Sequence, residues 1–413
     1  MATPKLRFKE FDGEWSKSSI LDLSKEKALN NGVFNDQNKV GKGYKLINVL
    51  DMYIERDIDE ARLSLLDLDA KEFERNKVKY GDIFFTRSSL VKEGIAFSNV
   101  YLGNANDVTY DGHLIKLSPN LERIDPIFLN FSLKTENVRK QLIQGGKTAT
   151  MTTIGQKEVG GCQLDIPSKK EQTKIASFLS AVDEKISQLT QKHELLSQYK
   201  QGMMQKLFSQ QIRFKADDGS EFGEWKEKKL SEICLKIKDG THFSPKTFEV
   251  GEYKYLTSKN VKNGYLDFSN LEFVSADDHK KIYSSCDVKF GDVLLTKDGT
   301  IGQCCVNTLT EEFSLLSSVA FLRLKSEFNN YFLYHILLSD LGQKEINGVI
   351  AGQALKRITL TKINDFKFMF PCLEEQTKIA NFLSAIDQKI DVVVQQIGQA
   401  KTWKKGSLQQ MFV

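Results

Sequence analysis

Apolar residues recur three and four positions apart along two stretches of the chain, residues 171–208 and 375–411. In the first stretch the alternation runs for about five heptads and includes Ile175, Leu179, Val182, Ile186, Leu189, Leu196 and Met203. In the second stretch it includes Ile379, Leu383, Ile386, Ile390, Val393 and Ile397. This spacing predicts two long helices, each with the apolar seam of a coiled coil. Because each buried Leu or Ile contributes about 1.5–3 kcal/mol, we expect the seams to be covered, most simply by each other.

Lys200 and Lys404 stand at equivalent positions of the two seams. A charge at a seam position lowers stability but restricts the register of the helices. Alternatively, both lysines lie beyond the packed part of the seam and extend to solvent along their apolar stems. The sequence leaves both interpretations open.

The two helices belong to a tandem repeat. Residues 170–186 and 374–390 are identical at 13 of 17 positions, at an offset of 204 residues, whereas the regions between them differ strongly. A weaker correspondence links Gly81-Asp82-Ile83 to Gly291-Asp292-Val293 at an offset of 210 residues. We therefore predict a globular domain at 1–166 (head 1), a helix at 167–210, a second globular domain at 211–370 (head 2) and a second helix at 371–413.

Each head shows a mixed pattern of short strands and helices. The β-rich runs 83–86 and 293–296 follow Gly-Asp turns, and helical patterns occur around 126–143 and 329–346. We predict an α/β (α+β) globule with its own core in each half.

The composition is that of an ordinary globular protein, with 40% hydrophobic and 27% charged residues. The sequence has no apolar run long enough to span a membrane and no secretion signal at residues 1–15, so we expect a cytoplasmic protein. The six cysteines form no Cys-x-x-Cys pair, and we expect reduced, mostly buried thiols. A net charge of +4 permits a nucleic-acid partner but does not require one.

A search for catalytic motifs finds none that is complete. Gly145-Gly146-Lys147-Thr148 resembles the end of a phosphate-binding loop, but Gln141 stands where that motif needs glycine. Asp292 and Lys297 have a spacing seen in nucleases, yet Asp82 at the matching place has no matching lysine. The five histidines show no metal-binding spacing, and an adenine methyltransferase would need adjacent prolines, which the chain lacks. We therefore expect no metal site and no catalytic residues.

Basic and hydroxyl-bearing residues follow the predicted strands at the same place in both halves. Arg and Lys can contact guanine edges or phosphates, and Ser and Thr can contact either. The candidate DNA-binding residues are Thr86, Arg87, Ser88, Ser89, Lys147 and Thr148 in head 1, and Thr241, His242, Lys259, Asn260, Lys297 and Thr300 in head 2. For any one of them an ordinary solvated turn is an equally good interpretation.

The sequence resembles the specificity subunits of type I restriction–modification enzymes along nearly its whole length. The motifs that carry the resemblance are Gly240-Thr241-His242, the runs 291–296 and 299–302, and Glu-Gln-Thr-Lys-Ile at 171–175 and again at 375–379. Head 1 departs from the pattern, because it has no Gly-Thr-His and Arg87-Ser88-Ser89 replaces the Gly-Thr turn.

The resemblance implies two target-recognition domains, each reading one half of an interrupted, asymmetric DNA site, with the two helices packed antiparallel as a spacer. It also implies two copies of a modification (methyltransferase) subunit docked on this chain, joined by restriction subunits with motor and nuclease activity. S-adenosylmethionine, ATP and Mg²⁺ are then expected on those partners, and no cofactor on this chain. The resemblance does not give the bases that are read.

A different class of function remains open from the residues alone. A coiled-coil scaffold with protein-binding heads would explain the helices, but not the matched basic loops. DNA binding and its dependence on salt distinguish the two hypotheses.

Overall fold

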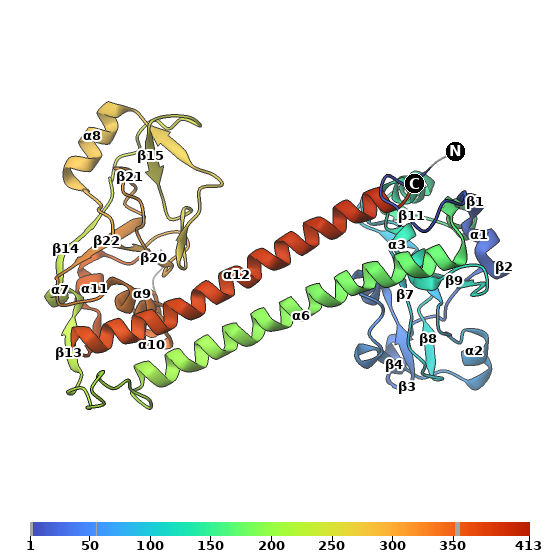
Figure 1. Cartoon of the computed structure of the whole chain (residues 1–413), viewed down its shortest axis with the longest axis horizontal. Coiled ribbons are helices and arrows are strands. Elements are labelled where there is room, and N and C mark those ends of the chain that lie inside the picture. The colour runs from blue at the N-terminus through green and yellow to red at the C-terminus, as the bar shows by residue number, and fades with distance from the viewer. Residues whose placement is uncertain (1–2, 55, 352–355) are drawn as a thin grey trace. The chain divides into compact units, whose positions relative to one another are not determined.

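The structure is a computed structural model that describes residues 3–54, 56–351 and 356–413. It divides into two compact units, Met1–Thr190 with Gln395–Val413 and Gln191–Val394 (Figure 1). Each unit contains one head together with one part of each long helix.

Head 1 is built around an antiparallel four-stranded sheet of order β2-β9-β5-β7. Two three-stranded sheets, β4-β3-β8 and β10-β11-β6, and the pair β1-β12 accompany it. The strands are β1 Ser16–Ser19, β2 Ser24–Asn31, β3 Val40–Ile47, β4 Ser64–Leu66, β5 Ile83–Thr86, β6 Ser88–Ser89, β7 Ser98–Val100, β8 Val108–Tyr110, β9 Leu114–Pro119, β10 Lys147–Thr148, β11 Thr152–Thr153 and β12 Gln163–Ile166. The helices are α1 Ile20–Leu23, α2 Ala70–Arg75, α3 Pro126–Leu133, α4 Glu136–Gly145 and α5 Gln156–Gly161.

Head 2 repeats the central sheet with the order β14-β22-β19-β20, beside β18-β15-β21, β13-β23 and β16-β17. Its strands are β13 Lys226–Lys229, β14 Cys234–Asp239, β15 Tyr253–Leu256, β16 Val261–Lys262, β17 Tyr265–Leu266, β18 Glu272–Val274, β19 Val293–Thr296, β20 Cys304–Val306, β21 Ser314–Leu315, β22 Val319–Leu324 and β23 Lys367–Phe370. Its helices are α7 Leu230–Ile233, α8 Ala276–Ser285, α9 Asn330–Leu338, α10 Asp340–Ile350 and α11 Leu360–Asp365.

The predicted strands at 83–86 and 293–296 are confirmed as β5 and β19, and both are fully buried. Each predicted helical pattern near the end of a head is instead two helices. Thr135 in head 1 and Ser339 in head 2 adopt extended backbone between them and serve as N-caps of the second helix. The six cysteines are free thiols, and all except Cys372 are buried, as expected.

The long helices are α6, Lys169–Phe208, and α12, Leu373–Met411. In the first unit Ile175 and Leu179 of α6 share the core of head 1 with Met411 and Phe412 at the end of α12. The second unit has the reverse arrangement, where the start of α12 (Ile379, Leu383, Ile386) and the end of α6 (Leu207, Phe208) share the core of head 2. The two helices therefore run antiparallel in each unit.

The predicted seam residues are not buried equally. Ile175, Leu179, Ile186, Leu189, Ile379, Leu383, Ile386 and Val393 are buried, whereas Val182, Leu196, Met203, Ile390 and Ile397 are half-buried. The most buried positions near the helix ends owe their burial to the heads as well as to the partner helix, because they belong to the head cores. A heptad pattern alone does not reveal this second partner.

Lys200 and Lys404 do not extend freely to solvent. In the second unit Lys200 Nζ lies 2.5 Å from Oδ1 of Asp387 on α12, and in the first unit Lys404 Nζ lies 2.5 Å from Oδ1 of Asp183 on α6. The lysine side chains are only 15% and 21% exposed. The same cross-helix pair thus occurs in each unit with the helices exchanged, which favours the interpretation that these lysines restrict the register.

The repeated Glu-Gln at the start of each long helix fastens the helix to its head. Glu375 is fully buried and accepts hydrogen bonds from Nε and Nη2 of Arg213 at 3.0 and 2.6 Å and from Trp225 Nε1 at 3.1 Å. Gln376 accepts the backbone N–H of Asn329 at 2.9 Å and donates to Pro371 O at 2.9 Å.

Head 1 makes the corresponding contacts. Glu171 accepts from Arg7 Nε and Nη2 at 2.7 and 2.8 Å and from Trp15 Nε1 at 3.4 Å. Gln172 accepts the backbone N–H of Asp125 at 2.8 Å. We call each Glu–Arg–Trp group a clamp. The strong repetition of Glu-Gln-Thr-Lys-Ile reflects these contacts rather than the seam alone.

No helix within residues 3–54, 56–351 and 356–413 combines the length and the apolar character that a bilayer span requires.

Removal of the carboxylate from a clamp should destabilise the protein. In Glu375→Ala the guanidinium of Arg213 and the Nε1–H of Trp225 lose a buried partner, and we expect the free energy of unfolding to fall by about 2–4 kcal/mol. Glu374→Ala, at the exposed neighbouring position, should change it by less than about 0.5 kcal/mol. Chemical denaturation of both variants measures this difference, and equal stabilities would show that the clamp contributes little.

His335 should make stability depend on pH. Its ring is buried, with Nε2 3.2 Å from Ser384 Oγ, and burial together with the nearby Lys200 lowers the pKa to about 3. The unfolded chain binds a proton near the ordinary pKa of 6.5, so the stabilising contribution is present above that pH and is lost progressively down to about pH 3. In His335→Leu this part of the pH dependence should disappear, whereas in His242→Leu, an exposed control, it should persist. Denaturant unfolding at a series of pH values tests this, and parallel curves for wild type and His335→Leu would contradict it.

Candidate nucleic-acid interface

In head 2 the loop after β19 is held by a buried ion pair. Lys297 follows Thr296 directly, and its Nζ lies 2.8 Å from Asp239 Oδ2 at the end of β14, with side chains that are 3% and 9% exposed. Asp239 Oδ1 is also 3.3 Å from Nε2 of His242, whose side chain is 67% exposed. Asp239 therefore links the buried lysine to an imidazole at the surface.

Close packing fixes the backbone between Asp239 and His242. A Cβ on Gly240 would lie 1.9 Å from the carbonyl oxygen of Leu315, so no other residue fits without movement of the backbone. Thr241 forms a parallel bridge with Leu316. The Gly-Thr-His motif is thus a rigid support that ends in one exposed side chain.

The loop around residue 258 joins the same edge of head 2. Ser258 N donates to Ser318 Oγ at 3.0 Å, and Lys297 N donates to Ser318 O at 2.9 Å. Asn260 is buried and accepts the backbone N–H of Thr257 at 2.9 Å. Lys259 between them is exposed.

Arg87 occupies in head 1 the place that Lys297 occupies in head 2. Arg87 N donates to His113 O at 2.9 Å and Arg87 O accepts from Ile154 N at 3.0 Å, just as Lys297 N donates to Ser318 O and Lys297 O accepts from Ile358 N. The side chains differ in their surroundings, because Arg87 is exposed and Lys297 is buried.

A cavity of about 460 Å³ lies beside Arg87 and is lined by Ser88, His113, Lys147 and Thr153, among others. The strands β6, β10 and β11, which pair into one small sheet, bring Ser88, Lys147 and Thr153 together. Three groups that can donate to DNA, the side chains of Arg87, His113 and Lys147, thus surround one hollow.

The candidate residues from the sequence fall into three groups by exposure. Exposed are Arg87, Lys147, Thr148, His242, Lys259 and Thr300; half-buried are Ser88 and Ser89; buried are Thr86, Thr241, Asn260 and Lys297. The buried members have structural partners, for example Thr86 Oγ1, which accepts the backbone N–H of Phe97 at 2.9 Å. Residue type and position in the repeat could not distinguish these groups, because burial depends on strands distant in the sequence.

Sequence reasoning missed the counterpart of Gly-Thr-His in head 1. It is Gly32-Val33-Phe34, where a Cβ on Gly32 would lie 2.1 Å from Tyr110 O and Val33 forms a parallel bridge with Asp111. The signal was present as Asn31-Gly32 and Asp239-Gly240, an Asx-Gly pair in which the Asx residue ends a strand, at an offset of 208 residues. The correspondence was hard to recognise because the two residues after the glycine differ between the heads.

The buried carboxylate of Asp111 organises this loop of head 1. Its Oδ1 accepts from the backbone N–H of His113 at 2.6 Å and lies 2.8 Å from His113 Nδ1, and its Oδ2 accepts from Asn35 Nδ2 at 2.9 Å. The His113 side chain is 66% exposed. In each head a buried aspartate therefore holds an exposed histidine beside the basic residue that follows the central strand.

The structure does not bring the weak catalytic candidates together. Asp292 pairs with Arg323 through two hydrogen bonds of 3.0 and 2.8 Å, whereas Lys297 pairs with Asp239. Gly145 ends α4 and Lys147 begins the short β10, so the Gly-Gly-Lys-Thr run does not follow a strand. In the described part of the chain no cluster of three or more His, Cys, Asp or Glu side chains could hold a metal ion.

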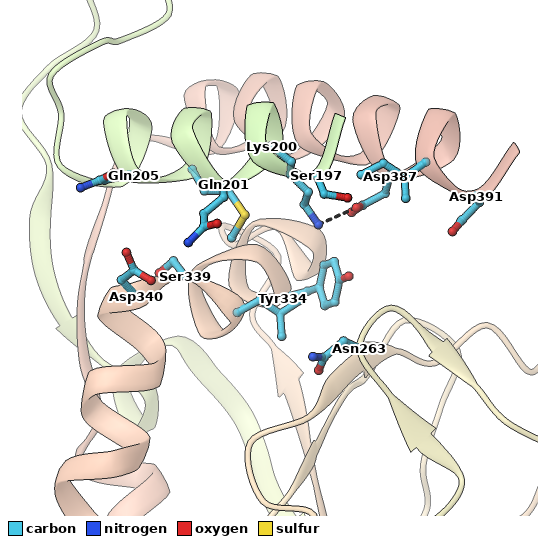
Figure 2. Close-up of a pocket in the computed structure, with 13 residues that line it drawn as sticks. Ser197, Lys200, Gln201, Gln205, Asn263, Tyr334, Ser339, Asp340, Asp387 and Asp391 are labelled. Atoms are coloured by element: carbon cyan, nitrogen blue, oxygen red, sulfur yellow. Dashed lines mark hydrogen bonds and ion pairs between the residues drawn. The ribbon is translucent and has the colours of Figure 1, made fainter. Parts of the chain in front are cut away.

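A second hollow, of about 420 Å³, lies in the second unit between the end of α6, the middle of α12 and helices α9 and α10 (Figure 2). Lys200 and Asp387 meet at its wall, with Tyr334 below them in the view. Burial raises the pKa of Asp387, and Lys200 opposes this shift. This hollow lies against the helix pair, whereas the Lys297 loop follows β19 of the central sheet.

Comparison with known proteins defines the class. A model of the type I restriction modification DNA specificity domain matches residues 13–198 and 223–401, so each half contains one such domain with part of its helix. The chain belongs to the family of type I restriction–modification DNA specificity subunits.

Individual relatives extend over most of the chain. The chain is 25% identical over 409 residues to the putative type I restriction enzyme MjaX specificity subunit of Methanocaldococcus jannaschii, covering 96% of this chain and 92% of the relative. It is 27% identical over 328 residues to the MjaVIII specificity subunit of the same organism, covering 76% of each. The crystal structure of the S subunit of a type I restriction–modification system from M. genitalium has a TM-score of 0.63 at 17% identity, covering 100% of this chain and 99% of that chain. This likeness confirms the fold of two domains and two long helices.

Arg87→Ala and Lys297→Ala should differ in their effects. Because Arg87 is exposed, its replacement by alanine should change the free energy of unfolding very little. If the Arg87 side chain contacts a base edge, however, the affinity for the target DNA should fall by about 1–3 kcal/mol. Loss of the Lys297 side chain leaves the carboxylate of Asp239 buried without its cation, so we expect the free energy of unfolding to fall by about 2–4 kcal/mol. Melting temperatures and binding to specific and scrambled duplexes at two salt concentrations measure both effects. An Arg87→Ala variant with unchanged affinity for both duplexes would remove Arg87 from the interface.

Proposed function

We propose that the two heads each read one half of a bipartite, asymmetric DNA site, so that this chain gives a type I restriction–modification complex its sequence specificity. The observation that carries the proposal is the repeated loop after the central strand. The backbone hydrogen bonds at Arg87 and at Lys297 are the same, but the side chains around them differ. One scaffold with two different sets of side chains suits the reading of two different half-sites.

The groups available on head 1 suit contacts to bases and phosphates. Arg87 is exposed, and a guanidinium can hold the O6 and N7 atoms of guanine through two bonds. Lys147 and Lys259 are exposed cations that suit phosphate contacts in head 1 and head 2. We infer that Lys297 acts mainly by fixing the loop, since its ammonium is buried against Asp239.

The helices are the proposed docking surface for two copies of the modification subunit. Leu195 and Tyr199 of α6 are 57% and 51% exposed, and Val392 and Val394 of α12 are 53% and 49% exposed. A contiguous patch of exposed apolar side chains marks a protein interface, and we propose that these residues belong to one. Restriction subunits would join through this assembly.

We further propose that the chain performs no catalysis itself. The methyl donor S-adenosylmethionine, and ATP with Mg²⁺, would then be bound by the modification and restriction subunits. The incomplete catalytic motifs of the sequence support this division of labour.

Exchange of one head should change one half of the site. If residues 1–165 are replaced by the matching block of a relative that also supplies an arginine and a tryptophan to Glu171, the clamp and the seams are retained. We then expect an active complex that modifies a site with one new half and one old half. Mapping of methylated bases in the DNA of cells that carry the hybrid measures the outcome. A change in both half-sites would contradict independent reading by the heads.

The salt dependence of binding separates DNA recognition from the scaffold alternative. Phosphate contacts release counterions, so the affinity of the assembled complex for DNA should fall steeply with salt. A complex that assembles but binds specific and scrambled duplexes equally weakly would contradict the proposed function.

A further inference from the structure

Phe34 and His242 stand at the same place in the two heads. Each is the second residue after a glycine that leaves no room for a Cβ, Gly32 against Tyr110 O and Gly240 against Leu315 O. The residue between this glycine and Phe34 or His242 forms a parallel β-bridge in both heads, Val33 with Asp111 and Thr241 with Leu316. The preceding strands, β2 and β14, hold equivalent edge positions in the two central sheets.

The side chain of Phe34 is unusually exposed for an aromatic residue on a fixed backbone. It is 79% exposed, more than any other phenylalanine among the exposed residues of the described chain. The backbone beneath it is held by Val33 N to Tyr110 O at 2.9 Å, Gly112 N to Val33 O at 2.7 Å and Asp36 N to Phe34 O at 3.1 Å. Because the backbone is already held, only the side-chain torsions of Phe34 lose freedom when a partner covers the ring.

Phe34 belongs to the same edge of head 1 as Arg87. Asn35, the next residue, donates to Asp111, which also holds His113, and His113 O accepts the backbone N–H of Arg87. The neighbours of Phe34 along the chain are polar or charged, from Asn35 to Lys39, so they provide no apolar cover. Hydrogen bonds thus link the loop that carries this exposed apolar ring to the loop that carries Arg87, a residue that suits phosphate and guanine contacts.

In the major groove of DNA, the 5-methyl group of thymine is the apolar feature of the base edges, and a phenylalanine ring can pack against it. We propose that Phe34 is a specificity-determining residue of head 1 that reads a thymine through its 5-methyl group, at the place where head 2 presents the imidazole of His242. This rests on the proposed function, because it requires that head 1 reads DNA. The two heads then differ in chemistry at one position of a common scaffold, apolar contact in head 1 and hydrogen bonding in head 2.

Deoxyuridine provides the test, because it pairs like thymine but lacks the methyl group. The assembled complex is titrated with its mapped target duplex and with duplexes in which each thymine is replaced singly by deoxyuridine. For the wild type we expect one replacement in the half-site of head 1 to weaken binding about fourfold, the effect of one buried methyl group. For Phe34→Ala we expect weaker binding to the normal duplex and no further loss at that position, and for Phe34→Leu we expect the sensitivity to persist.

Tyr80→Ala is the matched control. Tyr80 is also an exposed aromatic residue of head 1, at 46%, but it lies before β5 whereas Arg87 lies after it. This variant should retain both the wild-type affinity and the sensitivity to deoxyuridine. In every variant, deoxyuridine in the half-site of head 2 should act as it does in the wild type.

Three results would overturn the inference. The first is a Phe34→Ala variant that binds the target with wild-type affinity. The second is a Phe34→Ala variant that keeps the full sensitivity to deoxyuridine. The last is a Phe34→Ala variant that binds weakly, together with a wild type whose affinity is unchanged by deoxyuridine at every thymine. The last would indicate a wedge between base steps instead of a methyl contact. If the wild type itself does not prefer the mapped duplex over a scrambled one, the proposed function fails as well, so the two failures are distinguishable.

Discussion

The burial of helix ends in the head cores is the interaction on which the rest of the structure depends. The start of α6 and the end of α12 lie in the core of head 1, and the start of α12 and the end of α6 lie in the core of head 2. Neither core is complete without residues from both halves of the repeat. The clamps at Glu171 and Glu375 add directed hydrogen bonds to this apolar packing, because a buried carboxylate requires specific partners whereas a leucine does not. The antiparallel pairing of the helices therefore follows from the construction of the heads.

The long helices and the tandem repeat could be predicted because they depend on patterns within short stretches of sequence. The seams at Ile175 to Met203 and at Ile379 to Ile397 show period and identity directly, and β5 and β19 follow recognisable Gly-Asp turns. The partners of those patterns could not be predicted in the same way. Nothing in the heptads indicates that Ile379 packs against head 2, or that Lys200 pairs with Asp387, since both contacts join distant segments.

At the candidate interface, too, local features were predictable from the sequence, whereas contacts between distant segments were not. The place of Arg87 and Lys297 after the central strand was predictable from the repeat, and the structure gives the two residues the same backbone hydrogen bonds. Their exposure was not predictable, because buried Lys297 pairs with Asp239 from a strand almost sixty residues earlier in the sequence. Phe34 was missed for a related reason. Phe34 and His242 are equivalent because each follows a glycine whose backbone packs closely against another strand. In the sequence the glycine is the only sign of this close packing.

In each unit a tryptophan packs on a phenylalanine of the head, and the contacts around this pair bear on the order in which the two halves of the repeat occur in the sequence. In the second unit Phe208, at the end of α6, and Trp225 both pack on Phe332, and the polypeptide between them is continuous. In the first unit Phe412, at the end of α12, and Trp15 both pack on Phe128, and Leu6 N donates to Gln410 O at 2.9 Å. The same junction is therefore made once by a covalent connection and once by noncovalent contacts alone. The fold does not dictate which half is translated first, and a circularly permuted gene that joins the segment near Gln410 to the segment near Leu6 and opens the chain between Phe208 and Trp225 would encode the same set of contacts.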